Sequence, residues 1–381
     1  MSRRFVTSSF DKLRMKLNYI EASLGVLAVA AAVVSLLAAP VVAQAPTSAV
    51  KAPAASKAKT TGAKTTLRTP WGDPDLQGLW NDATSTPLQR PAAFGEKAVL
   101  TEDEAAEFQE DVAEDLTRDR RDGGPEADVN RAYNDHWMDA RRLKITEDHR
   151  TSLIVDPADG RMPPRVALSP ERQKIQADRA AGNARFLAGM PWSSEELSLP
   201  VRCIIRTDSP PYLPTIYNND FQIFQAPGYV VIQPEMIHSA RVIPLDGRPH
   251  LNSNLKQWLG DTRGHFEGDT LVVETTNFRT DPGVVYQGAV SDSFKITERF
   301  TRVDADAINY EFTVSDPKTW TKPWSARIPW TKIDPAEQMY EYMCHEDNYD
   351  IVHLLTGGRK REALGETVDT ARRPGGAGDD R

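Results

Sequence analysis

Four ionisable side chains in the second half of the chain occupy positions that suit acid–base chemistry. Glu298 falls within an apolar row of the strand-like segment 293–303, and Glu341 falls between two methionines in the segment 337–346. His345 shares the face of Glu341, and His238 shares a face with the apolar residues of the segment 234–245. A carboxyl group in an apolar interior beside a histidine is the arrangement that general acid–base catalysis needs. These four residues are therefore the candidate catalytic residues.

The alternative interpretation of the same carboxylates is structural. An ionised carboxylate inside a protein is costly unless it is paired or protonated. Glu298 and Glu341 would then form ion pairs with arginines, for which the sequence offers Arg327, Arg299 or Arg241. Alternation along 234–245 assigns Arg241 to the polar face of that segment, opposite the apolar face that carries His238.

Other residues are expected to bind a substrate. Arg241 or Arg263 would anchor an anionic group, and aromatic side chains would line an apolar pocket. The aromatic candidates are Trp324, Trp330, Tyr340 and Tyr342.

The segment 260–278 carries alternating acidic and basic residues between glycines, and it predicts a polar hairpin. Pairing of an aspartate in this segment with Arg263 would hold its turn. A cation site is the alternative, although the spacing does not match a calcium-binding loop. A metal-dependent hydrolase that uses His238 and His345 stays open as a further alternative. The chain has none of the GxSxG, Walker or GxGxxG motifs. Serine hydrolases and nucleotide enzymes are therefore disfavoured, and we expect no cofactor and no bound metal.

The elements that must position these residues are short strands. From about 212 to 346, β-branched and aromatic runs alternate with turn signals such as Pro227-Gly228, Asp246-Gly247 and Gly268-Asp269. This pattern predicts a mainly β fold, an antiparallel meander that closes as a lipocalin-like barrel or stacks as a sandwich. Peripheral helices are expected from the N-terminal half, one opening with the capping box Thr101–Glu104 and one with Ser169-Pro170.

The N-terminus predicts export. A basic stretch is followed by a long apolar run that ends in small residues, with cleavage expected after Ala43. An uncleaved membrane anchor is the alternative. The expected organisation is a signal peptide (1–43), a flexible linker (44–68), a helical and loop region (69–200), the barrel domain (201–356) and a flexible C-terminal tail (357–381). The protein would be periplasmic or extracellular, with no membrane span after cleavage.

Net charge bears on the class of partner, and the cysteines bear on disulfide formation. Removing residues 1–43 deletes five basic and two acidic side chains, so the net charge moves from -8 to -11. The mature chain has no basic stripe, which argues against nucleic acid as a partner. Cys203 and Cys344 are the only cysteines, and export favours a disulfide between them over two free thiols.

Several long segments also carry a resemblance. They include "PDLQGLW", "PGYVVIQPEMIHSARVIPLDGRPH", "GDTRGHFEGDTLVVETTNF" and "YEYMCHEDNY", and the similarity spans about 73–355. The set resembles an uncharacterised family of exported bacterial proteins. The resemblance implies export and a single domain, and it implies no activity.

The residues therefore predict an exported protein that binds a small, partly apolar organic molecule in a barrel pocket. Its leading interpretation is a cofactor-free acid–base lyase, isomerase or hydrolase. A non-catalytic, lipocalin-like binding protein needs the same pocket without the converging acid and base, and it stays open as the alternative.

Overall fold

The computed structural model describes residues 67–116, 124–125, 143–206, 208–237, 239–280, 291–334 and 336–368. The strands are β1 (Gly78–Asn81), β2 (Ile154–Asp156), β3 (Asp220–Ala226), β4 (Tyr229–Pro234), β5 (Arg241–Pro244), β6 (Asp261–Glu267), β7 (Thr270–Thr276), β8 (Lys295–Arg302), β9 (Ala307–Ser315) and β10 (Trp324–Lys332). The α-helices are α2 (Glu102–Leu116), α4 (Pro170–Leu187) and α5 (Asp350–Ala363), and the 3₁₀ helices are η1 (Ala92–Phe94) and η4 (Ser194–Glu196). The signal peptide expected over 1–43 lies outside the described residues.

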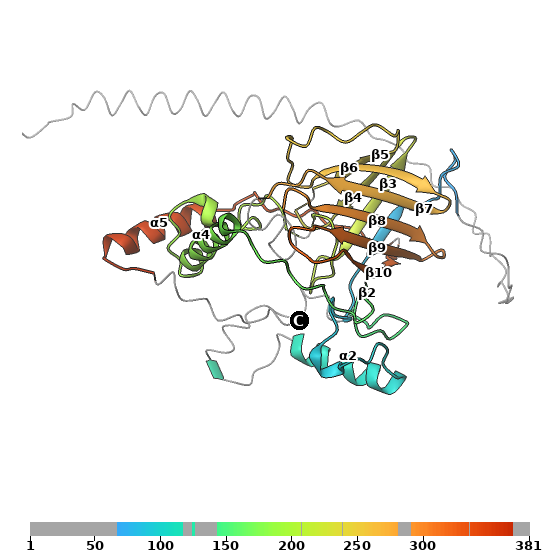
Figure 1. Cartoon of the computed structure of the whole chain (residues 1–381), viewed down its shortest axis with the longest axis horizontal. Coiled ribbons are helices and arrows are strands. Elements are labelled where there is room, and N and C mark those ends of the chain that lie inside the picture. The colour runs from blue at the N-terminus through green and yellow to red at the C-terminus, as the bar shows by residue number, and fades with distance from the viewer. Residues whose placement is uncertain are drawn as a thin grey trace, which may run out of the picture. The chain divides into compact units, whose positions relative to one another are not determined.

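The described strands form one ten-stranded antiparallel sheet that curves into a nearly closed barrel (Figure 1). Its order is β5-β4-β3-β1-β10-β9-β8-β7-β6. β2 pairs with the part of the β10 edge that β1 leaves uncovered. Most neighbours are consecutive in the chain and are joined by short turns, as in a meander. The predicted mainly β barrel is therefore confirmed, although β1 comes from the region expected to be helical and loop.

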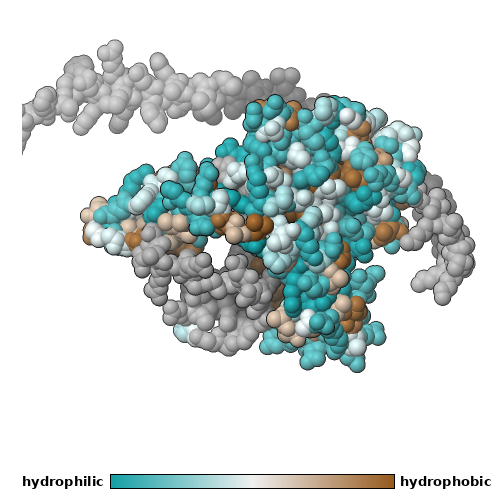
Figure 2. All heavy atoms as spheres, viewed as in Figure 1, coloured by the Kyte–Doolittle hydropathy of each residue, from teal (hydrophilic) through white to brown (hydrophobic). Residues whose placement is uncertain are grey.

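Alternating burial along the strands separates an interior face from a solvent face. In β8 and β9 every second residue is buried, and the residues between them are partly exposed. The outward residues are mostly polar, and the face in view in Figure 2 is mainly hydrophilic. This is the two-residue period that a strand with one buried face requires.

The interior of the barrel is packed rather than hollow. Trp330 stacks on Phe221 with ring centroids 4.4 Å apart, and Phe300 stacks on Tyr310 at 4.8 Å. The loop 208–213 enters the same space and is buried throughout, and Tyr212 contacts the rings of Phe221, Tyr310 and Trp330. Trp324 and Trp330, expected to line a pocket, are core residues instead. Burial of large aromatic rings is the main stabilising contribution that such an interior offers.

Two segments that alternation predicts to be continuous strands differ from that prediction in the structure. The segment 234–245 breaks after Pro234, and β5 begins only at Arg241. Between them Ile237 has φ 63°, a left-handed conformation that β-branched residues rarely adopt. The break resets the alternation, so Arg241 points inward and Val242 outward, opposite to the expected assignment.

The segment 337–346 is not a strand either. Residues 337–349 form no helix or strand, and Glu341, Met343 and His345 are all exposed. The alternation of methionine and glutamate resembles a strand, but none of the described strands pairs with it.

The barrel closes at a seam between β5 and β6, which lie at the two ends of the strand order. No strand pairing joins them within the described residues. Side chains seal the seam instead, because Gly264 of β6 faces Ile243 of β5 and Leu245 beyond it. A Cβ atom on Gly264 would lie 2.6 Å from Cγ2 of Ile243 and 3.0 Å from Cδ2 of Leu245. Only glycine allows the two edges to approach this closely.

Replacing Gly264 by alanine is therefore expected to lower the free energy of unfolding by about 1–3 kcal/mol, the usual cost of overpacking a core. Urea unfolding measures it. In an Ile243→Ala background the cost of Gly264→Ala should be smaller by about 1 kcal/mol or more, because the nearer of the two colliding atoms is gone. Gly357→Ala in α5 is the matched control, since no heavy atom lies within 4 Å of its Cβ position. An equal cost for Gly264→Ala in both backgrounds would contradict the seam contact.

The helices begin as the sequence predicts. The backbone N–H of Thr101 donates to Glu104 Oε2 at 2.8 Å, and the N–H of Glu104 donates to Thr101 Oγ1 at 3.3 Å, which is the reciprocal capping box. Ser169 caps α4, with Pro170 at its first position. No helix in the described part of the chain combines the length and apolar character needed to cross a membrane.

The expected chain boundaries change at both ends of the fold. A flexible linker was expected up to residue 68, but its two described residues are bonded to the fold. Leu67 O accepts from the N–H of Asp75, and Arg68 pairs with Asp269. A flexible tail was expected from residue 357, but that residue lies inside α5, which continues to Ala363. Glycines 357 and 358 suggest a break, but Gly358 is buried against the backbone of Met190, where a side chain would not fit. The disulfide between Cys203 and Cys344 is present as predicted.

Candidate functional site

A buried ion pair occupies the barrel interior where acid–base residues were expected. Nη1 and Nη2 of Arg241 donate to the two carboxylate oxygens of Glu298 at 2.8 and 3.1 Å. The hydroxyl of Tyr310 donates to Glu298 Oε1 at 2.9 Å and accepts from the backbone N–H of Tyr212 at 3.1 Å. Glu298 is fully buried and Arg241 is 3% exposed. Arg241 crosses the interior from one side of the seam to β8, so this pair also holds the barrel closed.

In the cluster around Glu298, the environment of each ionisable group keeps its protonation state constant. Burial disfavours the charged form of Arg241, but the adjacent Glu298 carboxylate outweighs it and raises the arginine pKa. Burial raises the pKa of Tyr212 and of Tyr310, so both phenols stay protonated. With Arg241 and Tyr310 bonded to Glu298, and rings filling the space around it, the carboxylate has no room to meet a substrate.

The expected catalytic residues do not converge as far as the structure describes them. Glu298 is inside the barrel, whereas Glu341 and His345 are exposed on the segment 336–349. His238 lies outside the described residues. Tyr340 is also exposed, and Tyr342 lies partly buried on the same segment. The structural interpretation of Glu298, pairing with Arg241, is the one the geometry supports.

The hairpin of β6 and β7 turns between Glu267 and Thr270, whereas the Asp–Arg pair lies at its other end, where Asp261 is the partner of Thr276. Arg263 Nη1 donates to Asp261 Oδ1 at 2.7 Å, and His250 Nδ1 lies 2.9 Å from Asp261 Oδ2. Burial alone would raise the pKa of Asp261, but hydrogen bonds from Leu251 N–H, His250 and Arg263 lower it. Arg263, expected to anchor a substrate, is therefore paired with Asp261 on the outer face of the barrel. Among the described residues no group of His, Cys, Asp and Glu side chains could hold a metal ion.

A groove outside the barrel is the site that the sequence did not reveal. It has a volume of about 820 Å³ and lies over the outer face of β9 and β10. Ala307, Asn309, Pro329 and Thr331 form its floor, and the segment 144–150 forms one wall. We call it the β10 groove.

The groove exists because β10 has a gap along one edge. β2 pairs with Ser325 and Ala326, and β1 pairs with Thr331 and Lys332, so no described strand covers residues 328–330 on that edge. Arg327 N–H donates to Leu153 O at 2.9 Å, and alternate residues direct their N–H groups to the same edge. Position 329 would therefore aim an N–H into the gap, and proline has none. This explains how Pro329 is tolerated inside a strand.

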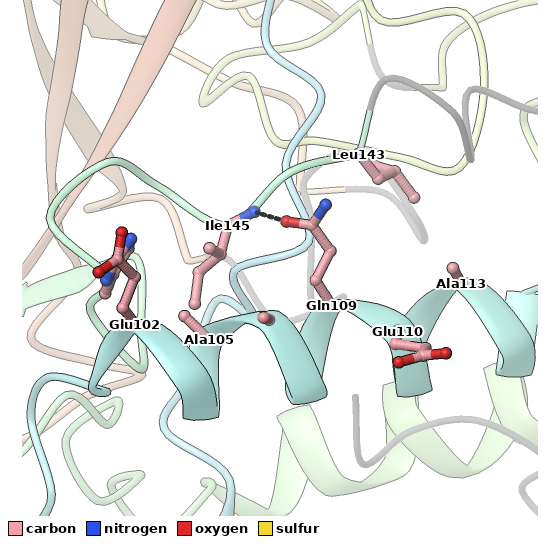
Figure 3. Close-up of a pocket in the computed structure, with 9 residues that line it drawn as sticks. Glu102, Ala105, Gln109, Glu110, Ala113, Leu143 and Ile145 are labelled. Carbon is pink, nitrogen blue, oxygen red and sulfur yellow. Dashed lines mark hydrogen bonds between the residues drawn. The ribbon is translucent and has the colours of Figure 1, made fainter.

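The wall of the β10 groove is fastened from both sides. Thr84 Oγ1 donates to Lys144 O at 2.7 Å, and Thr146 N–H donates to Thr86 Oγ1 at 3.0 Å. Figure 3 shows Gln109 of α2 reaching toward Ile145, whose N–H donates to its side-chain oxygen at 3.2 Å. A second hollow of about 470 Å³ lies there, lined by one face of α2 and by residues of the segment 143–149. Three anchors make the wall a fixed part of the site.

The floor and the wall of the β10 groove each offer a polar group that is not bonded to the described residues. The side-chain amide of Asn309 makes no hydrogen bond to another described residue, and the same holds for the ammonium group of Lys144. Ile145, Ala307 and Pro329 contribute apolar surface to the same groove. A few polar groups in an otherwise mixed or apolar concavity are typical of a small-molecule site.

Comparison with models of known protein families and with curated proteins found no match. The resemblance to an exported bacterial family therefore stays a prediction, and the functional argument rests on the geometry.

Proposed function

We propose that this chain is a non-catalytic binding protein that holds a small, partly apolar organic molecule in the β10 groove. One observation carries the proposal. The sheet leaves a gap on β10 between β1 and β2, and a firmly anchored wall turns that gap into a concavity of about 820 Å³. The binding site would thus lie outside the barrel, and not inside it as the sequence suggests.

The barrel interior supports the binding interpretation over the acid–base one. The carboxylate of Glu298 is held by Arg241 and Tyr310 inside the barrel. The two further acid–base candidates, Glu341 and His345, are exposed to solvent. An acid–base enzyme needs its proton donor and acceptor within reach of one substrate. Ligand binding needs only the groove.

Export remains part of the proposal. The disulfide between Cys203 and Cys344 supports it, because such bonds persist in oxidising compartments outside the cytosol. The predicted signal peptide is the other support.

Filling the β10 groove is expected to abolish ligand binding. Ala307 is half-buried on the groove floor, and a tryptophan there would occupy the space of a ligand. Titration with the fluorescent probe 1-anilinonaphthalene-8-sulfonate should show at least tenfold weaker binding to Ala307→Trp than to the wild type. The matched control is Thr297→Trp, at a half-buried outward position of β8 outside the groove. Equal affinity of the wild type and Ala307→Trp would exclude the groove as the site.

A further inference from the structure

We propose that the ligand of the β10 groove is an organic acid whose carboxylate binds between Arg150 and Arg327. This inference rests on the proposed function, because it names the chemistry of the same site. Both arginines line the groove, one from its wall and one from β10.

Arg150 is nearly buried and incompletely bonded. Its side chain is 11% exposed, and its Nη2 donates to the backbone oxygen of Arg327 at 3.0 Å. Its Nε lies 3.5 Å from Asp148 Oδ1 and makes no hydrogen bond to the described residues. A buried donor without an acceptor is destabilising, so this nitrogen favours an incoming acceptor.

Arg327 places a second positive charge beside the first. Its Nε and Nη2 both donate to Glu311 Oε2 at 3.1 Å, and its Nη1 makes no hydrogen bond to the described residues. Burial lowers the pKa of Arg150, the Asp148 carboxylate raises it in part, and the charge of Arg327 lowers it again. Two guanidinium groups held together in a half-desolvated site repel each other, and an anion between them relieves that repulsion.

The neighbouring carboxylates select a singly charged ligand. Asp148 and Glu311 each neutralise part of the positive charge, so the site has little excess for a dianion such as a phosphate monoester. A carboxylate carries one charge and matches the planar fork of arginine with two parallel hydrogen bonds.

The rest of the ligand follows from the register of the strands. Arg327 pairs with Glu311, and the next outward pair along the strands is Pro329 with Asn309. Two residues span about 7 Å along a strand. The ligand would therefore carry its carboxylate at one end, an apolar body over Pro329 and Ala307, and a hydrogen-bonding group within reach of Asn309.

A matched pair of probes tests the charge. 2-Naphthaleneacetate and 2-naphthaleneacetamide share a ring system and differ in charge, and each is titrated against bound 1-anilinonaphthalene-8-sulfonate. For the wild type we expect the inhibition constant of the acid to be at least tenfold lower than that of the amide. In Arg327→Gln the two constants should agree within twofold. Arg327 is 45% exposed, so its replacement leaves the core intact. Arg248→Gln is the control, because Arg248 is 48% exposed and paired with Asp246 outside the groove.

The outcomes separate the two proposals. Equal displacement by acid and amide, or no displacement by either, overturns the organic-acid inference while groove binding stands. A tenfold preference that survives in Arg327→Gln also overturns it. If filling the groove with Ala307→Trp leaves binding of the fluorescent probe unchanged, the proposed function itself fails. Arg150→Lys provides a second variant, which keeps the charge and removes the fork, and it should reduce the preference for the acid.

Discussion

Replacing Glu298 by alanine is expected to lower the free energy of unfolding by about 3–5 kcal/mol. The substitution leaves the guanidinium of Arg241 without its partner inside the barrel, where burial already disfavours the charged form. The phenol of Tyr310 also loses its acceptor. Equilibrium unfolding in urea, followed by circular dichroism, measures the change. Because Arg241 crosses the interior near the seam, hydrogen exchange should also rise in β5 and β6 more than in β9.

Two further variants separate a buried unpaired charge from the loss of side-chain volume. The double variant Arg241→Met/Glu298→Leu removes both charges and should recover most of the lost stability, since apolar replacements of buried ion pairs are often neutral or stabilising. Glu267→Ala breaks a surface pair with Arg299, both about half exposed, and should cost less than about 1 kcal/mol. A double variant as unstable as Glu298→Ala would contradict the charge argument.

Opening the disulfide between Cys203 and Cys344 is expected to lower the free energy of unfolding by about 2–5 kcal/mol, and the long loop favours the upper end of that range. The bond joins residues 141 positions apart, and a closed loop of that size restricts the unfolded chain strongly. The measurement compares urea unfolding of the wild type with the Cys203→Ser/Cys344→Ser variant, both without reductant.

Local protection distinguishes this effect from general damage. The side-chain amide of Asn348 donates to Cys203 Sγ at 3.2 Å and to Cys344 O at 3.1 Å, so the bond also anchors the segment that leads into α5. Hydrogen exchange should rise over 336–363 and stay unchanged in β8. A double variant that unfolds within about 1 kcal/mol of the wild type would show that the crosslink contributes little.

The fold could be predicted because the sheet is antiparallel and has one buried face. Phe294, Ile296, Glu298 and Phe300 share the interior row that alternation assigns to them, with Glu298 at its centre. Turn signals at Pro227-Gly228 and Gly268-Asp269 mark hairpins that the structure contains. Period and turn chemistry are local properties, so the sequence carries them directly.

The site could not be predicted for reasons that are also physical. Alternation assigns faces only while a strand continues, and the break at 235–240 reversed the assignment of Arg241. Arg241, which alternation assigned to the solvent face, lies in the interior, because Glu298 supplies a partner from a strand more than 50 residues away. Arg150 and Asn309 meet at the β10 groove through tertiary packing alone. The one local signal was Pro329, since proline within a strand marks an edge or an interruption in pairing.

The gap along β10 also affects how copies of this chain meet one another. A strand edge with open donors and acceptors is a template for another extended chain, which is how intermolecular β-pairing and aggregation begin. At this gap Pro329 supplies no donor, and Arg150 occupies the carbonyl of Arg327. A foreign strand would find few backbone groups to bond. The opening that admits a small molecule is thus protected against self-assembly by the same two side chains that shape it.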